Sequence, residues 1–164
     1  MYCQETAKEA AKVLGIEEAG VLVGSTGVIG MQLPIDRIKA GISELAKVKK
    51  AGIESGTEAA KAIMTTDTKK KEVAVQFQIG DKTVTIGGMA KGSGMIHPNM
   101  CTMLAFITTD AVISRKALQK AMSNDVEETY NMISVDGDTS TNDTALLLAN
   151  GMAGIRRSKR NTGI

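Results

Sequence analysis

Aromatic residues are scarce in this sequence of 164 residues: Tyr2, Phe77, Phe106 and Tyr130 are the whole set, and there is no tryptophan. Proteins that bind single-stranded nucleic acid stack its bases on aromatic side chains, so the composition argues against that class of function. The core is expected to consist of aliphatic side chains, with alanine and the ten methionines filling the gaps between them.

Cysteine is also rare. Cys3 and Cys101 are the only two, which is too few for a disulfide framework, and their spacing matches no metal site. We expect free thiols in a reducing cytoplasm. No secretory signal peptide is visible, and the longest apolar runs fall well short of the ~20 residues that span a bilayer. The sequence therefore predicts a soluble cytoplasmic protein without membrane contact.

Neither sign of charge is in large excess. The formal net charge is +2, from 20 basic and 18 acidic residues. Four of the basic residues crowd the last ten positions, and without them 16 basic residues face 18 acidic ones. These four are Arg156, Arg157, Lys159 and Arg160. A nearly neutral body with a short basic end indicates a solvated terminus and no nucleic-acid partner.

Hydrophobic periodicity predicts a mixture of helices and strands. Pro34 suits the first turn of a helix, Ser114 is expected to cap another, and alternating apolar residues around Gly80 and Asp81 predict an antiparallel hairpin with one buried face. Helices are expected over residues 3–14, 35–49, 57–64, 102–109, 114–124 and 143–150, short strands over 21–23 and 132–135, and the hairpin over 72–86. We therefore predict a single α/β domain in which helices flank a layered sheet.

Two glycine-rich segments are candidate binding sites. The first, Gly24 to Gly30, is either a simple turn after a strand or a nest of backbone N–H groups facing an anion. It is not a nucleotide-binding P-loop, because Met31 and not lysine follows Gly30. The second begins as a loop at Gly87, runs to Asp110 and contains the only histidine. Its glycines suit positive φ angles or close approach to a ligand.

Thr102 lies where the second segment meets an apolar stretch, and two interpretations are open. Threonine at such a place is usually a helix cap or first-turn residue. It becomes a useful nucleophile when an amine acts as its base, and the nearest amine is its own once the Cys101–Thr102 peptide bond is cut. An α-amino group titrates near about pH 8, so it accepts a proton readily close to neutrality.

The acidic segment from Asp136 to Asp143 resembles a calcium loop only superficially. In EF-hand spacing, Ser140 and Thr141 stand at the fifth and sixth positions and Leu147 at the twelfth. Those positions need an acidic or amide side chain, a glycine and a glutamate. We expect no metal here, and predict a polar turn that caps a helix beginning at Asp143.

Several motifs carry a specific resemblance. They are STGVIG over residues 25–30, IMTTDT over 63–68, KGSGMIHPNM over 91–100, TMLAF over 102–106, TTD over 108–110 and DGDTSTNDT over 136–144. Together they resemble the ornithine acetyltransferase family, the bifunctional glutamate N-acetyltransferases of arginine biosynthesis. The resemblance runs from about Cys3 to Gly154. It implies the fold of that family in a partial domain, with residues 1–101 resembling the end of an α chain and 102–164 the start of a β chain.

In that family the precursor cuts itself before a threonine, which then accepts the acyl group. The resemblance therefore places the cleavage site at Cys101 and Thr102 and makes Thr102 the catalytic nucleophile. Thr26 and Gly27 match the residues whose hydroxyl and N–H form the oxyanion hole. Cys101 departs from the family, which commonly has alanine there, but it contributes only its carbonyl group, so cleavage is expected to survive.

The resemblance also implies the substrates and partners. Lys91 and Thr68 match the residues that hold the amino-acid substrate, with Thr68 chosen by its distance from Lys91. The implied reaction moves an acetyl group from N-acetylornithine to glutamate, with acetyl-CoA left open as another acetyl donor and no other cofactor. Cleaved chains of the family form heterodimers, and these heterodimers pair.

Length leaves two alternatives open. Family precursors are much longer and carry further motifs on both sides, so this chain could instead be a catalytically incomplete, non-cleaving fragment that acts only as a scaffold. Such a fragment is expected to self-associate. A phosphate- or nucleotide-binding module that uses the turn from Gly24 to Gly30 is a third possible function, and we rank it below both the acetyltransferase and the scaffold.

Overall fold

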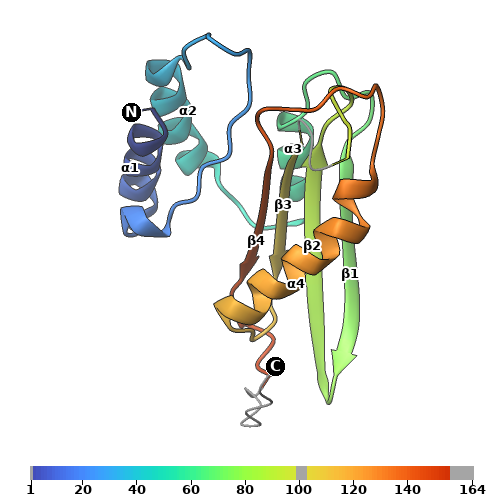
Figure 1. Ribbon diagram of the computed structural model, residues 1–164. Coiled ribbons are helices and arrows are strands. Elements are labelled where there is room, and N and C mark those ends of the chain that lie inside the picture. The colour runs from blue at the N-terminus through green and yellow to red at the C-terminus, as the bar shows by residue number, and fades with distance from the viewer. Residues whose placement is uncertain (1, 99–102, 156–164) are drawn as a thin grey trace. The chain divides into compact units, whose positions relative to one another are not determined.

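The computed structural model describes residues 2–98 and 103–155. The chain forms two compact units, Met1–Gly56 and Thr57–Ile164. Figure 1 labels the helices and strands of both. The boundary predicted between residues 101 and 102 lies outside the described residues and stays a prediction.

The first unit is built on a pair of packed helices. α1 (Tyr2–Leu14) buries Ala7 and Ala11 and lies against α2 (Ile35–Val48). An ion pair joins Lys39 of α2 to Glu5 of α1. These contacts follow from apolar stripes at helical spacing on both helices. The helices predicted over residues 3–14 and 35–49 are confirmed.

The strand predicted over residues 21–23 is wrong. A short 3-10 helix, η1 (Glu18–Gly20), is followed by irregular chain until α2 begins. The described part of this unit contains no strand to which a short apolar run could pair, so its backbone groups cannot form a ladder. The predicted glycine turn is present, because the Met31 N–H donates to the Val28 carbonyl over 3.2 Å and Gly30 has φ of 84°.

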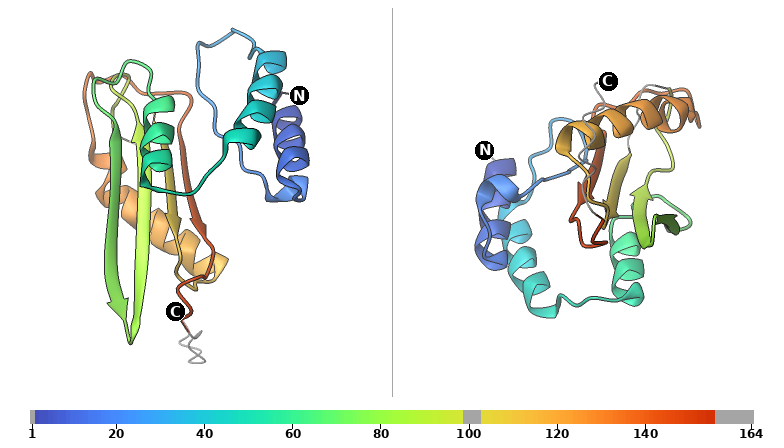
Figure 2. Two further views of the ribbon diagram at one scale, coloured as in Figure 1. Left: turned by 180° about the vertical axis from the view of Figure 1, so that it is seen from behind. Right: turned by 90° about the horizontal axis from the view of Figure 1, so that it is seen from below.

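A four-stranded sheet organises the second unit. Its strands are β1 (Lys71–Ile79), β2 (Lys82–Lys91), β3 (Leu104–Thr109) and β4 (Thr144–Ala149), in the order β1-β2-β3-β4. The first two pairings are antiparallel and the third is parallel. Helix α4 (Arg115–Glu128) lies along one face, and the end of α3 (Ile53–Ala62) lies on the opposite face (Figures 1 and 2). The predicted α/β fold, a sheet with flanking helices, is confirmed.

The predicted hairpin is confirmed but is longer than expected. β2 continues through Gly87 and Gly88 to Lys91, so the prediction that a loop starts at Gly87 is wrong. The prediction of one buried face is also wrong for β1, whose residues are all exposed, whereas Val84 of β2 is completely buried. β1 is an edge strand with a single neighbour, so its apolar side chains have less to pack against.

Two predicted helices are strands. The helices predicted over residues 102–109 and 143–150 are wrong, because residues 104–109 form β3 and residues 144–149 form β4. Phe106 and Ile107 favour strands by shape. The leucines of β4 favour helices in isolation, and pairing with β3 decides their conformation. The parallel pair needs a crossover connection, which α4 supplies.

Helix α4 begins where the sequence predicts. The Ser114 hydroxyl oxygen accepts a hydrogen bond from the Ala117 N–H over 3.2 Å, so the predicted cap is confirmed. Of the side chains predicted to face inward, Leu118 and Met122 are half-buried, whereas Ala117 and Ala121 are exposed. The helix predicted over residues 57–64 is confirmed as α3, which starts four residues earlier.

The strand predicted over residues 132–135 is wrong. A 3-10 turn, η2 (Tyr130–Met132), precedes an extended segment that pairs with no strand of the described sheet. Val135 instead donates its N–H to the Ile96 carbonyl over 2.8 Å. The backbone of Val135 thus contacts a loop, whereas the apolar side chains of Met132, Ile133 and Val135 are exposed.

Replacing Ser114 with alanine is expected to lower the free energy of unfolding by about 0.5–2 kcal/mol, because the first turn of α4 loses its capping acceptor. Urea unfolding monitored by circular dichroism measures the change. Ser134 is the matched control, since it is exposed and its hydroxyl forms no hydrogen bond with the described residues. Ser134→Ala is expected to change the stability by less than about 0.5 kcal/mol. Equal stabilities of the two variants would contradict the cap.

Candidate functional site

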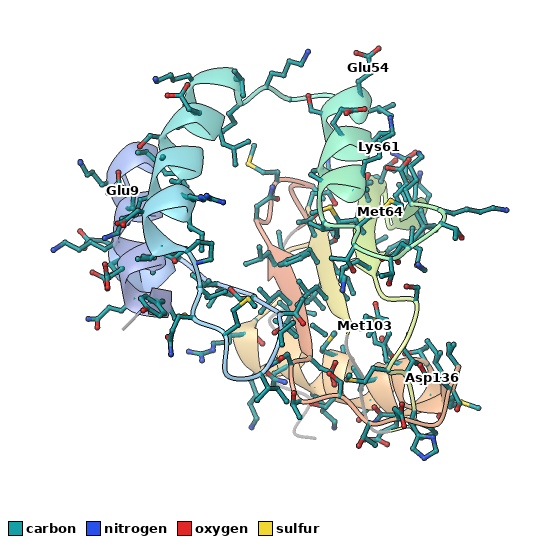
Figure 3. All side chains as sticks on the ribbon, turned by 90° about the horizontal axis from the view of Figure 1, so that it is seen from above. Glu9, Glu54, Lys61, Met64, Met103 and Asp136 are labelled. Carbon is teal, nitrogen blue, oxygen red and sulfur yellow. The ribbon has the colours of Figure 1, made fainter. Side chains whose placement is uncertain are left out.

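Three connections of the second unit meet at one end of the sheet. The first precedes β1, the second joins β2 to β3, and the third precedes β4 (Figure 1). Figure 3 looks onto the molecule from this end, where Met64, Met103 and Asp136 mark the three connections in turn. Most of the motifs that carry the family resemblance lie in these connections.

Asp67 ties the first connection to the second. Its side chain has 0% exposed surface, and its carboxylate accepts hydrogen bonds from the Gly92 backbone N–H over 2.9 Å and from the Lys71 ammonium group. The neighbouring hydroxyl groups of Thr66 and Ser93 lie 2.6 Å apart and share a hydrogen bond. The side chains of residues 66–67 therefore bind the backbone N–H of Gly92 and the side-chain hydroxyl group of Ser93.

The charge of Asp67 is maintained by its partners. Burial is the largest influence and raises the pKa, but the hydrogen bonds from Lys71, Gly92 and Thr65 together outweigh it and lower the pKa of Asp67 from 3.8 to about 2. The carboxylate is therefore ionised near neutral pH. Gly92 has φ of 147°, a backbone conformation that favours glycine, and it presents its N–H to this buried charge.

Asp136 holds the same loop from the third connection. Its two carboxylate oxygens accept the backbone N–H groups of Met95, over 2.6 Å, and Ile96, over 2.9 Å. These two hydrogen bonds lower the pKa of Asp136 below its ordinary value. Met95 has φ of 56°, which is uncommon for a residue with a side chain. The loop after β2 is thus fixed at several successive residues.

Asp143 fixes the start of β3. Its carboxylate accepts the Met103 N–H over 2.8 Å, and the Thr144 N–H donates to the Met103 carbonyl over 3.0 Å. Met103 is buried. The prediction that Asp143 begins a helix is wrong, because the residue stands directly before β4 and binds the backbone of a neighbouring segment.

Lys91 is a buried cation at the end of β2. The residue is 4% exposed and forms no hydrogen bond or ion pair with another described residue. In the β2–β3 register it stands opposite Leu104, at the start of β3. Limiting the contact of an ammonium group with water costs free energy unless an anion compensates for it. The position is therefore suited to an anionic ligand.

The other predicted substrate residue, Thr68, is exposed and forms no hydrogen bond with the described residues. Thr66, from the same motif, instead contacts Ser93 beside Gly92. Both threonines belong to the connection that Asp67 anchors, so the motif and Lys91 lie at the same end of the sheet.

The predicted oxyanion and cleavage residues remain predictions. Thr26, which is half-buried, and Gly27, which is exposed, belong to the first unit. Cys101 and Thr102 lie outside the described residues. Within the part of the chain that the structure describes, no three His, Cys, Asp or Glu residues are grouped closely enough to hold a metal ion. No helix of that part has the length and apolar character to cross a membrane.

A separate cavity of about 360 Å³ lies on the sheet and not at residues 92–96, the clamped loop that Asp67 and Asp136 hold. Its lining is mainly apolar and includes Val73, Ile86, Ile107 and Tyr130. Burial raises the pKa of the Tyr130 hydroxyl. Neither Asp67 nor Lys91 lines this cavity. We therefore take Lys91, and not the cavity, as the candidate ligand site.

Sequence reasoning missed the functions of Asp67, Asp136 and Asp143, although all three belong to the motifs that carry the resemblance. Their shared role is to accept backbone N–H groups from other segments. Aspartates among glycine and hydroxyl residues are typical of such side-chain to backbone bonds. That signal was available, but it does not say which distant backbone the carboxylate binds.

Replacing Asp67 with asparagine preserves the shape of the side chain but removes its charge and one acceptor oxygen. The free energy of unfolding is expected to fall by about 1.5–3 kcal/mol, the range for hydrogen bonds to charged groups. Because the folded pKa is depressed, the carboxylate stabilises the wild-type fold above its ordinary pKa. That contribution is lost as the pH falls from 3.8 towards about 2.

Urea unfolding between pH 7 and pH 2 measures both effects. Asp81→Asn is the control, because the Asp81 side chain is 88% exposed in the hairpin turn. Wild-type and Asp67→Asn proteins with the same pH dependence of unfolding would contradict the role of the buried carboxylate.

The model of the ArgJ family matches residues 1–163 of this chain. The arginine biosynthesis bifunctional protein ArgJ of Symbiobacterium thermophilum is 56% identical over 150 residues, which cover 92% of this chain and 37% of that protein. The glutamate N-acetyltransferase of Methanocaldococcus jannaschii is 52% identical over 157 residues, covering 92% and 39%. The chain thus spans 37% and 39% of the length of these two curated relatives.

A solved structure agrees with these relatives. The crystal structure of the arginine biosynthesis bifunctional protein ArgJ from Bacillus halodurans aligns with a TM-score of 0.56 and 46% sequence identity, over 60% of this chain and 50% of that one. The matched family, the relatives and the fold point the same way: the chain belongs to the ArgJ family.

Proposed function

We propose that this chain contributes to an acetyltransferase of arginine biosynthesis that moves an acetyl group from N-acetylornithine to glutamate. The names of its relatives, bifunctional ArgJ and glutamate N-acetyltransferase, support this reaction class. Acetyl-CoA is a second candidate donor of the acetyl group. We expect the enzyme to work in the cytoplasm.

The low exposure of Lys91 is the main observation that supports the proposal. N-Acetylornithine and glutamate both carry an α-carboxylate, and the ammonium group of a lysine that is only 4% exposed and has no carboxylate partner among the described residues suits such a ligand. The clamped loop that follows Lys91 is fixed by Asp67 and Asp136. A ligand carboxylate at Lys91 would therefore lie beside a loop whose backbone is already fixed. Thr68, at the same end of the sheet, is proposed as a further substrate contact.

The first chemical step is self-cleavage at Thr102. The Thr102 hydroxyl oxygen attacks the Cys101 carbonyl carbon, a C–O ester bond forms, and the peptide C–N bond breaks, so the hydroxyl proton goes to the released α-amine. Water then hydrolyses the ester and leaves a carboxylate on Cys101. The products are two polypeptides, which we propose remain together as a heterodimer that pairs with a second one.

Acetyl transfer uses the same hydroxyl group. With the free α-amine as base, Thr102 attacks the acetyl carbonyl carbon of N-acetylornithine, and the proton passes to the departing ornithine amine. The glutamate amine then attacks the acetyl ester, and the Thr102 hydroxyl regains a proton. Thr26 and Gly27 are proposed to donate hydrogen bonds to the oxyanion, a contribution of about 3–4 kcal/mol per donor in other acyl-transfer enzymes.

Intact-mass measurement after expression tests the cleavage. The wild-type chain is expected to give two products whose masses divide between residues 101 and 102. Thr102→Ala removes the attacking hydroxyl group and is expected to give one uncut species. Thr102→Ser keeps a hydroxyl group, so it is the matched control and is expected to be cut. An uncut wild-type chain would overturn self-cleavage and favour the non-cleaving scaffold.

Lys91→Met tests the substrate contact. Methionine has similar length but no charge, so Kd for glutamate and N-acetylornithine is expected to rise roughly 10- to 100-fold, as for the loss of a charged hydrogen bond of about 1.5–3 kcal/mol. Isothermal titration calorimetry measures it. Lys69→Met is the control, since Lys69 is exposed and has no ion-pair partner among the described residues. Unchanged affinity in Lys91→Met would contradict the proposed carboxylate contact.

A further inference from the structure

β1 lies at an open edge of the four-stranded sheet. It has β2 as its single neighbour in the described sheet, and all the residues of the strand, Lys71–Ile79, are exposed. Figures 1 and 2 show that the turn end of the hairpin extends beyond α4, so part of the strand lies past the helix. An edge strand offers its unpaired N–H and C=O groups to another strand.

β1 has few of the features that usually protect such an edge. Native edge strands carry charged side chains, proline or bulges, or are covered by another segment. Residues 73–79 contain no charged residue and no proline, and the pairing with β2 runs without a bulge. Apolar side chains alternate along this stretch, and they are between 42% and 68% exposed. They are Val73, Val75, Phe77 and Ile79.

The hydrogen bonds of β2 show which backbone groups of β1 face the open edge. The Thr85 carbonyl of β2 accepts the Asp110 N–H over 3.3 Å, on the side of β3. Successive residues of an antiparallel strand direct their polar groups to opposite sides, so Ile86 faces β1, where Val75 stands opposite it. The even-numbered residues of β1, from 72 to 78, therefore direct their N–H and C=O groups outward.

We propose that β1 is the surface on which two copies of this chain pair, antiparallel and edge to edge, with Val75 of one copy opposite Val75 of the other. This register uses the whole strand, because Lys71 then stands opposite Ile79 of the second copy. Every outward-facing N–H and C=O group of β1 meets a partner, whereas a shift by two residues in either direction would leave some of them unpaired. The same patch is used by both copies, so the assembly closes as a dimer.

The side chains agree with this register. Val73 of one copy stands opposite Phe77 of the other, and valine stands opposite valine at the centre. These odd-numbered residues form the pairs without direct hydrogen bonds, in which side chains approach most closely. Continuing the alignment beyond the strand places Lys69 opposite Asp81 of the second copy, which is a pair of opposite charges. Lys69 is exposed, and the Asp81 side chain is 88% exposed.

The apolar cavity on the sheet gives a further reason to expect a second copy here. Val73 and Val75 of β1 line it, together with Ile86 and Ile107 of the next two strands. In the proposed register, Phe77 of the second copy lies against Val73, on the side of the cavity that β1 forms. The largest apolar side chain of the strand thus meets an exposed apolar surface, and burying both stabilises the dimer.

Charge substitutions at position 75 test the pairing, because this residue stands opposite itself. The wild-type full chain is expected to dimerise in analytical ultracentrifugation. Val75→Lys and Val75→Glu each place like charges face to face, so the dissociation constant of each is expected to rise at least roughly 100-fold. An equimolar mixture of the two variants places opposite charges face to face and is expected to dimerise again.

Val48→Lys is the matched control, since it makes the same change at a valine of α2 that is 69% exposed. It is expected to dimerise like the wild type. Circular dichroism verifies that each variant folds. The result does not depend on the proposed self-cleavage, because β1 and its neighbour β2 both precede residue 101.

Amide hydrogen exchange of the wild-type chain gives a readout that needs no variant. It is measured at protein concentrations above and below the dissociation constant. In the dimer, the even-numbered amides of β1 are expected to exchange at least about tenfold more slowly than in the monomer, whereas the odd-numbered amides, bonded to β2, stay protected in both.

Several outcomes would overturn the proposal. A wild-type chain that stays monomeric, or one that forms assemblies larger than a dimer, would do so. A mixture of Val75→Lys and Val75→Glu that stays monomeric while both variants are folded would also do so. Slowed exchange that does not alternate along β1 would exclude this register of pairing.

Discussion

The buried carboxylate of Asp67 is the interaction on which the end of the sheet depends. Its negative charge lies on a side chain with no exposed surface, where the Lys71 ammonium group and the N–H groups of Gly92 and Thr65 stabilise it by donating hydrogen bonds. One partner lies on β1 and another directly after β2. The Asp67 carboxylate thus fixes the backbone at Gly92, where the chain leaves the end of β2.

The same physical device occurs three times at this end, where carboxylates of the first and third connections bind the connection between β2 and β3. Asp67, Asp136 and Asp143 all accept backbone N–H groups from segments distant in the sequence. Backbone N–H groups in loops have no ladder partners, and a carboxylate satisfies them more strongly than a neutral acceptor does. The glycine-rich loop after β2 is in this way held by hydrogen bonds at Gly92, Met95 and Ile96.

Local patterns predicted the elements whose periodicity was clear. The packed helices of the first unit, the cap at Ser114 and the hairpin of β1 and β2 all followed from such patterns, and the family resemblance followed from motifs. The leucines of β4 were misread as a helix, because their conformation depends on pairing with β3, a contact made across the whole of α4. Burial was misjudged on β1 because alternation does not say whether a strand lies at an edge.

The candidate site could be predicted only in part, because the burial and the partners of its residues also depend on tertiary structure. Lys91 could be singled out by motif, but its burial depends on tertiary packing. The three aspartates could be recognised as turn residues, whereas the N–H groups that they accept lie 25 to 41 positions away in the sequence. Such long-range partners are set by the order of the strands, and no local pattern contains that order.

The order of the strands has a topological consequence for any break in the chain at residue 101. β1 and β2 come before that point, and β3, α4 and β4 come after it. Six residue pairs, from Ile86 with Thr109 to Lys91 with Leu104, join β2 to β3 in one continuous ladder. Two separate polypeptides would therefore share a single sheet, and hydrolysis of one bond would create a new terminus while the main-chain hydrogen bonds between β2 and β3 kept the two polypeptides associated.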